Sequence, residues 1–280
     1  MESENTPSEF KFHDGRRYHN VENAVYPMPN DENEQDRLHF QHFLMRYLMQ
    51  NNFSASINHI LTTPGAKILD VGYPNIEIYG LDISLLQLTN TKPKNFTFIK
   101  ANVLEGIPFE DNTFDFVYQR FLSYAYTKDE WSSAINELVR VLKPGGFLEL
   151  MEPSPSLFDL GPIAKRIWDA QSSLVIQRGV DLEVYQRLEE YLQNQGHLEN
   201  IEKVVKEIRH GVKSNDIQFN KVGINNIVSI MAGMKAHTTK ILQVSDDEFD
   251  ELLKAAEKEL YESDFYYYLV RVYASKNCIQ

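Results

Sequence analysis

The chain has 280 residues, a formal net charge of −12 at pH 7 and 24% charged residues, values that are ordinary for a folded globular protein and exclude low-complexity and fibrous classes. The acidic balance argues against broad nucleic-acid binding, because sequence-independent binding needs a basic surface. The single cysteine, Cys278, excludes an internal disulfide framework and a multi-cysteine zinc site. The polar start does not resemble a secretory signal, and no apolar run approaches the roughly 20 residues that span a bilayer. We therefore expect a cytoplasmic or nuclear protein.

The N-terminal part is expected to combine an irregular arm with two helices. Pro27 and Pro29 disfavour a helix over residues 1–29. The acidic turn that begins at Asp31 and the apolar spacing after it predict a helix at about 31–50, with a shorter one near 53–62. The predicted apolar face of the first helix comprises Phe40, Phe43, Leu44, Tyr47 and Leu48.

The middle of the chain has the pattern of a parallel α/β sheet. Short apolar runs predict strands at 67–72, 76–81, 96–101, 114–118 and 147–151. Thr127 and Glu130 have the spacing of a capping box before an amphipathic helix, and Lys143-Pro144-Gly145-Gly146 ends that helix. Strands that alternate with helices indicate parallel pairing.

The last 120 residues are expected to be mainly helical. Segments near 156–178 and 182–195 are amphipathic, Ser245 and Glu248 form a second capping-box pattern, and 266–274 is rich in strand-forming residues. Residues 201–208 fit a helix as well as a strand. We divide the chain into an N-terminal arm with cap helices (1–62), a sheet core (63–155) and an elaboration of the same domain (156–280).

Chemistry-bearing residues follow successive predicted strands. Gly72 ends the first strand, Asp82 the second and Asn102 the third, and Gln119 follows the fourth. Open α/β sheets bind ligands at the carboxyl ends of their strands. A carboxylate suits a ribose diol and an amide suits an adenine edge, so together these residues indicate an adenosine-containing ligand. Taken singly, Asp82 fits a helix cap equally well, and Asn102 fits a turn residue better than a ligand contact.

The order of the motifs resembles the class I S-adenosylmethionine-dependent methyltransferases. The motifs are Ile68-Leu69-Asp70-Val71-Gly72, Tyr79-Gly80-Leu81-Asp82-Ile83-Ser84, Ile107 to Asp115 and Leu142 to Gly146, and the leader from Tyr26 to Leu38 is similar to that of the fungal LaeA-like type. The resemblance implies a Rossmann-like methyltransferase sheet with helices on both faces, an N-terminal helical leader and a helical C-terminal elaboration. It implies S-adenosylmethionine as the cofactor. It also implies that Asp82 holds the ribose, Ile83 and Val103 flank the adenine, Asn102 meets the adenine amino group, and Gln119 lies near the cofactor or substrate.

The first connection of the sheet departs from that family. Its glycine-rich G-x-G-x-G loop and first helix are missing, since Tyr73-Pro74-Asn75 alone separates Gly72 from the next predicted strand. A five-residue strand is about 17 Å long, whereas four connecting residues span at most about 14 Å. We therefore expect that the two strands pair abnormally, that the first is displaced, or that a segment has been lost through splicing or the gene model.

Two function classes remain in view. The first is a methyltransferase of unknown acceptor, a small molecule or a protein. The alternative is a catalytically inactive methyltransferase-like interaction or regulatory protein, or a truncated product, that no longer binds the cofactor. A nicotinamide dehydrogenase is disfavoured because G-x-G-x-x-G is absent. We expect no metal site, since no H-x-H or H-E-x-x-H pattern occurs, and no catalytic base is named because the sulfonium is already a strong electrophile.

Overall fold

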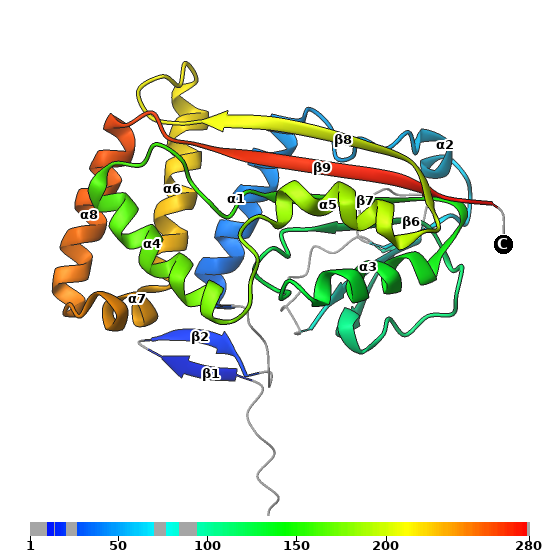
Figure 1. Ribbon diagram of the computed structural model, residues 1–280, viewed down its shortest axis with the longest axis horizontal. Helices are drawn as coiled ribbons and strands as arrows, with labels where there is room; N and C mark the ends of the chain where they lie inside the picture. The colour runs from blue at the N-terminus through cyan, green and yellow to red at the C-terminus, as the bar shows by residue number, and fades with distance from the viewer. Residues whose placement is uncertain (1–9, 14, 21–26, 70–76, 84–93, 279–280) are drawn as a thin grey trace, which may run out of the picture. The chain divides into compact units, whose positions relative to one another are not determined.

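A computed structural model describes residues 10–13, 15–20, 27–69, 77–83 and 94–278 (Figure 1). The chain divides into two compact units, each built from segments that are distant in sequence. The helical unit comprises Met1–Gln50, Ser156–Val180 and Ile208–Tyr267, and the sheet unit comprises Asn51–Pro155, Asp181–Glu207 and Tyr268–Gln280. Among the described residues, no helix is both long and apolar enough to cross a bilayer.

The sheet has seven strands in the order β5-β4-β3-β6-β7-β9-β8. Pairing is parallel from β5 to β7, and β9 runs antiparallel to β7. The strands are β3 (Lys67–Leu69), β4 (Glu77–Asp82), β5 (Phe96–Lys100), β6 (Phe114–Arg120), β7 (Leu142–Pro153), β8 (Leu198–Arg209) and β9 (Tyr266–Lys276). The predicted α/β class with a parallel Rossmann-like sheet is confirmed, and residues 201–208 belong to a strand.

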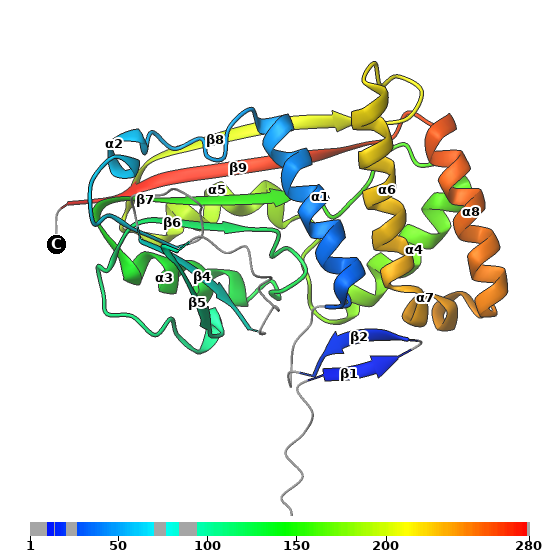
Figure 2. The ribbon, with the colours of Figure 1, turned by 180° about the vertical axis from the view of Figure 1, so that it is seen from behind.

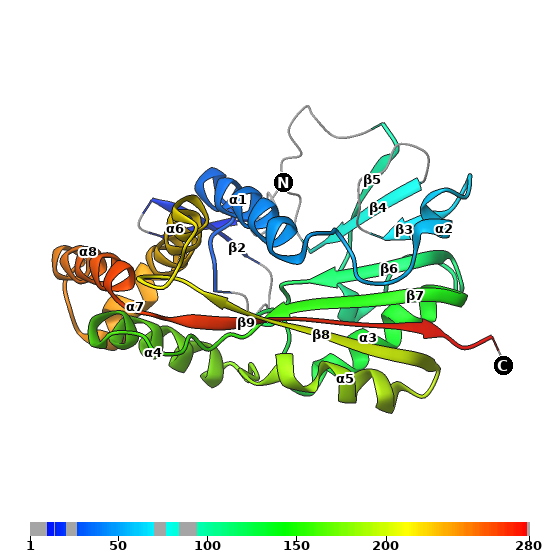
Figure 3. The ribbon, with the colours of Figure 1, turned by 90° about the horizontal axis from the view of Figure 1, so that it is seen from above.

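Two helices cover one face of this sheet (Figures 1 and 3). They are α3 (Glu130–Val141) and α5 (Val184–Gln195), and their buried side chains form one cluster with β6 and β7. Trp131, Leu138 and Leu188 are central members of this cluster and at most 2% exposed. On the other face, Phe53 packs edge-on against Phe116 and Tyr118, in the segment that leads to the short helix α2 (Asn58–Leu61). The core therefore fixes β6 from both sides.

The strands β3 and β4 are parallel neighbours in the sheet, which the sequence analysis did not expect from their short connection. Lys67, Ile68 and Leu69 pair in parallel register with Glu77, Ile78 and Tyr79. The prediction of an abnormal pairing was therefore wrong. The structure describes β3 as far as Leu69 and β4 from Glu77. Gly72 and the rest of 70–76 lie outside the described residues.

The helical unit contains five helices and a hairpin among its described residues. They are α1 (Glu32–Met49), α4 (Pro162–Gln177), α6 (Ile217–Gly233), α7 (Lys235–Leu242) and α8 (Asp246–Glu262), with β1 (Phe10–His13) and β2 (Arg16–His19) forming the hairpin. The capping box of Ser245 and Glu248 begins α8, as predicted. The prediction of an irregular arm was wrong for the hairpin, where Gly15 takes the left-handed φ of 72° that the turn requires.

Helix α1 buries only part of the face that its apolar spacing predicts. Leu44 is buried and Leu48 half-buried, as predicted. Phe40, Phe43 and Tyr47 are 60–63% exposed, whereas Glu34 and Arg37 are buried. Arg37 donates to both carboxylate oxygens of Glu34 and, at 2.9 Å, to Oδ1 of Asn226 on α6. Because the two charges neutralise each other and are hydrogen-bonded, this polar face can pack against α6.

Candidate functional site

The carboxyl ends of the parallel strands define one edge of the sheet unit (Figure 2). From β3 the chain proceeds outward to β4 and β5, and then returns to β6 and β7 on the other side of β3. The strand order therefore reverses between β3 and β6. In open α/β sheets, ligands bind in the crevice outside the strand ends at this switch point.

Two predicted site residues end β4. Asp82 is its last residue, paired in register with Lys100 of β5, and Ile83 follows directly. Both are half-buried. A carboxylate is a hydrogen-bond acceptor that can bind the hydroxyl groups of a ligand.

The residues after β5 form a short 3₁₀ turn, η1 (Val103–Glu105). Asn102 is its N-cap, because its Oδ1 accepts a hydrogen bond from the Leu104 N–H at 3.1 Å. Its Nδ2 donates to Glu105 Oε1 at 2.9 Å, and Val103 is buried. The Asn102 amide thus has local partners, and among the described residues one of its N–H groups and one of its lone pairs have none.

Gln119 lies near the carboxyl end of β6, beside the switch point. Its side chain is buried, and its Oε1 accepts a hydrogen bond from the Tyr126 hydroxyl at 3.2 Å. Tyr126 is buried in turn and packs edge-on against Trp131. Among the residues that the structure describes, none accepts a hydrogen bond from Gln119 Nε2.

A carboxylate that the sequence analysis did not single out holds the turn after β6. Glu152, fully buried near the end of β7, accepts hydrogen bonds from the backbone N–H groups of Leu122 and Ser123 at 3.0 Å and from Ser123 Oγ at 2.7 Å. Burial raises the pKa of Glu152 to about 7, although these three donors favour the charged form. The sequence signal was available, because Glu152 interrupts an apolar strand at its carboxyl end.

The strand ends of β4 and β6 fit a nucleoside with a polar extension. Asp82 offers paired acceptors for a diol, and Gln119 offers an N–H donor without a protein partner among the described residues. Native proteins rarely leave a buried donor unsatisfied. The donor set at this edge is thus compatible with S-adenosylmethionine, which carries a ribose diol and a carboxylate.

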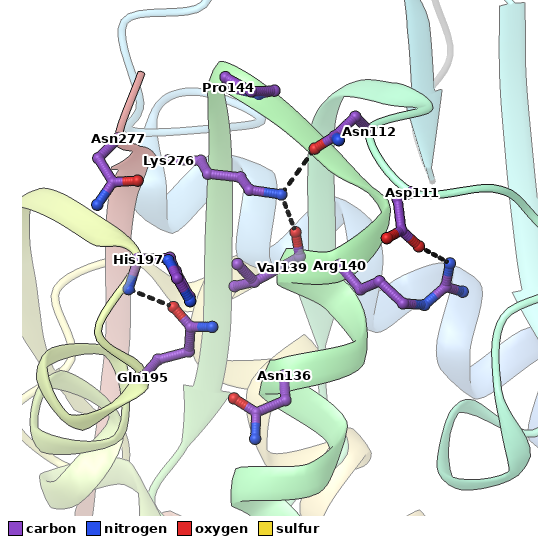
Figure 4. A pocket seen from close by; sticks show the side chains of 10 residues that line it. All are labelled: Asp111, Asn112, Asn136, Val139, Arg140, Pro144, Gln195, His197, Lys276 and Asn277. Atoms are coloured by element: carbon purple, nitrogen blue, oxygen red, sulfur yellow. Dashed lines mark hydrogen bonds and ion pairs between the residues drawn. The ribbon is translucent and has the colours of Figure 1, made fainter. Parts of the chain in front are cut away.

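A hollow of about 570 Å³ lies at the opposite edge, near the starts of β6 and β7 (Figure 4). Its charged groups already have partners. Lys276 Nζ donates to Asn112 Oδ1 and to the Val139 and Leu142 carbonyl groups at 2.7–2.8 Å, and Arg140 pairs with Asp111 at 2.8 Å. These contacts satisfy carbonyl groups at the C-terminus of α3.

Comparison with known proteins identifies a methyltransferase domain in the middle of the chain. Residues 63–150 match the family described as methyltransferase domain. Methyltransferase pytC from Aspergillus terreus is 32% identical over 158 residues, which make up 51% of this chain and 46% of that protein. The secondary metabolism regulator laeA from Aspergillus niger is 28% identical over 163 residues, or 52% of this chain and 42% of that protein.

A third relative aligns along most of both chains. N-methyltransferase tcpN from Claviceps purpurea is 26% identical over 272 residues, covering 85% of this chain and 93% of that protein. By contrast, the chain spans about half the length of pytC and laeA. The sheet order, the domain match over residues 63–150 and these relatives support the resemblance of this chain to the class I S-adenosylmethionine-dependent methyltransferases of the LaeA-like type.

Proposed function

We propose that the sheet unit binds S-adenosylmethionine at the carboxyl ends of β4, β5 and β6 and that the chain transfers the methyl group to a nucleophilic acceptor. The observation that carries this proposal is the convergence of Asp82, Asn102 and Gln119 on one sheet edge, next to the switch point. These residues are far apart in sequence, and only the parallel strand order aligns them.

Each residue has a defined task in this proposal. Asp82 accepts hydrogen bonds from the two ribose hydroxyl groups, while Ile83 and Val103 provide apolar contact for the adenine ring. Asn102 uses its remaining N–H or lone pair on the adenine edge. The bound cofactor supplies an electrophilic methyl group on sulfur, and the protein contributes mainly by aligning the acceptor with it.

The relatives suggest which acceptors to test first. tcpN is named an N-methyltransferase, and its alignment covers most of this chain. We therefore infer that a nitrogen nucleophile is the first acceptor class to screen. A neutral amine, rather than an ammonium ion, has the lone pair that attacks the methyl carbon.

The test is calorimetric titration of the full chain with S-adenosylmethionine. Asp82→Ala should weaken binding about tenfold or more, because hydrogen bonds to a charged group are among the stronger ones. Glu77→Ala is the matched control, since Glu77 is a carboxylate at the opposite end of the same strand and is exposed. Absence of binding by a folded wild-type chain would refute the proposal and favour the inactive alternative.

A further inference from the structure

The strand β8 forms one edge of the seven-stranded sheet. It is the last strand in the sheet order, so β9 is its only neighbouring strand among the described residues (Figure 1). With 12 residues, β8 is longer than most strands. The N–H and C=O groups on the outer side of an edge strand can pair with a strand of another chain. β8 is therefore a surface that can extend the sheet into a partner.

The hydrogen bonds at the end of β8 indicate which of its residues face outwards. Just beyond the strand, the His210 N–H group donates to the Phe265 carbonyl group at 2.9 Å, on the side of β9. The backbone groups of successive residues in a strand point to opposite edges. Those of the even-numbered residues of β8 thus face β9, and those of the odd-numbered residues from 201 to 207 face outwards.

The charges of β8 balance, unlike those of the whole chain. The strand carries the acidic residues Glu199, Glu202 and Glu207 and the basic residues Lys203, Lys206 and Arg209. Its formal net charge is zero, whereas that of the chain is −12. Two copies of the chain repel each other over most of their surface, but this repulsion is locally absent along β8.

The order of residues along β8 favours a second copy of this chain as the partner. Residues 201–208 have the same sequence in both directions, Ile-Glu-Lys-Val-Val-Lys-Glu-Ile. An antiparallel partner strand is met in reverse order. A second copy therefore presents to β8 the same succession of apolar and charged residues that β8 itself has.

A two-fold axis at Val205 brings opposite charges together. Val205 is 51% exposed, and in this register it packs against Val205 of the partner subunit. Lys203 then lies directly opposite Glu207 of the partner subunit, once on each side of the axis. The Lys203 ammonium group has three donors, of which the Gln186 carbonyl group of α5 takes one at 3.3 Å, and a carboxylate accepts several hydrogen bonds. Such cross-strand pairs stabilise an antiparallel ladder.

We propose that β8 is a self-association surface, on which two copies of this chain pair antiparallel along residues 201–207 about a two-fold axis at Val205. Lysines on an edge strand ordinarily oppose pairing with other strands. Here the second copy supplies a carboxylate opposite Lys203, so the same charges select this partner over others. A single strand pairing buries less area than a standard interface, and the dimer therefore dissociates on dilution.

Exchange of the paired charges tests the register. In sedimentation velocity of the full chain over a concentration series, Lys203→Glu and Glu207→Lys should each weaken the dimer about tenfold, because each places like charges opposite each other twice. An equimolar mixture of these two variants should associate as the wild type does, since both positions then pair opposite charges. Lys254→Glu and Glu251→Lys are the matched controls on the exposed face of α8 and should leave the dimer unchanged.

Substitution on the axis tests the backbone pairing. Val205→Pro removes an N–H group that faces away from β9, so the sheet keeps its own bonds and the dimer should be lost. Val205→Thr retains this N–H group and the branched shape, and should retain the dimer. Circular dichroism shows whether each variant is folded, and the charge exchange decides the question if Val205→Pro is not.

Three results would overturn the proposal. The first is a wild-type chain that stays monomeric up to about 0.3 mM. The second is a dimer that the mixture of Lys203→Glu and Glu207→Lys does not restore, because it then uses another surface or register. The third is a folded Val205→Pro variant that dimerises as the wild type does. None of these results bears on cofactor binding, so the proposed function stands or falls separately.

Discussion

The buried carboxylate of Glu152 should give the sheet unit an unusual dependence on pH. Burial raises its pKa from 4.5 in the unfolded chain to about 7 in the folded protein. Between these values the folded state binds more protons than the unfolded state, so stability falls as the pH rises and is constant above about 7. Most carboxylates with folded-state partners act in the opposite direction.

The size of this stability change follows from the difference between the folded and unfolded pKa values of Glu152. A pKa difference of one corresponds to about 1.36 kcal/mol, so the free energy of unfolding should fall by about 3 kcal/mol between acidic pH and pH 8. The protein's pI of about 5.2 makes the acidic end of this range prone to precipitation. Between pH 6 and pH 8 the same linkage still predicts a loss of about 1.3 kcal/mol for the wild type.

Glu152→Gln should remove this loss. The variant places an N–H group against a backbone donor, which lowers stability at every pH by about 1–3 kcal/mol. The informative quantity is therefore the slope of unfolding free energy against pH, and not the offset. Relative to the wild type, the variant should gain about 1.3 kcal/mol between pH 6 and pH 8.

Urea unfolding monitored by tryptophan fluorescence would measure this slope for the sheet unit. The protein has two tryptophans, and a Trp168→Phe background leaves Trp131, which is fully buried in the sheet unit. Glu137→Gln is the control, because the Arg140 guanidinium lowers the pKa of Glu137 and its effect lies below pH 4.5. Parallel wild-type and Glu152→Gln profiles from pH 6 to pH 8 would refute the reasoning.

Three further predictions concern the helical unit and can be measured by urea unfolding in a Trp131→Phe background. Arg37→Ala should cost about 3 kcal/mol or more, because it leaves the buried Glu34 carboxylate unpaired; a loss below about 1 kcal/mol would contradict this. Ser245→Ala should cost about 1 kcal/mol by removing the N-cap of α8, and an unchanged midpoint would be evidence against the cap. Burial lowers the pKa of His210 to about 4, so wild-type stability should fall as the pH decreases below 6.5, whereas His210→Phe should not show this fall.

Much of the sheet was predictable because its signals are local. Apolar runs marked the five parallel strands, and β9 was recognised from its aromatic and β-branched residues. The helices α6 and α7 were not predicted, although Asp216 caps α6 by accepting a hydrogen bond from the Phe219 N–H. Apolar residues of α6 itself lie on most sides of the helix, so its sequence shows no clear helical period. The face that α1 buries depends on Asn226, a partner 189 residues away, and no local pattern reports it.

The candidate site was predictable only as a set of strand-terminal residues. The positions of Asp82, Asn102 and Gln119 followed from the ends of apolar runs, but their hydrogen bonds did not. Asn102 caps a 3₁₀ turn, and the Tyr126 hydroxyl donates a hydrogen bond to the Gln119 amide oxygen. Both contacts depend on groups that meet across turns. Their roles towards a cofactor remain proposals.

The missing glycine pattern bears on whether this chain binds the cofactor. In the family that this chain resembles, backbone amides of a glycine-rich loop lie close to the methionine part of the cofactor. Here seven residues connect β3 to β4, and the sequence offers no G-x-G-x-G to provide that approach. A carboxylate brought to this edge still requires donors. Cofactor binding in this chain therefore depends on donors other than such a loop, and the titration of the full chain with S-adenosylmethionine tests whether they suffice.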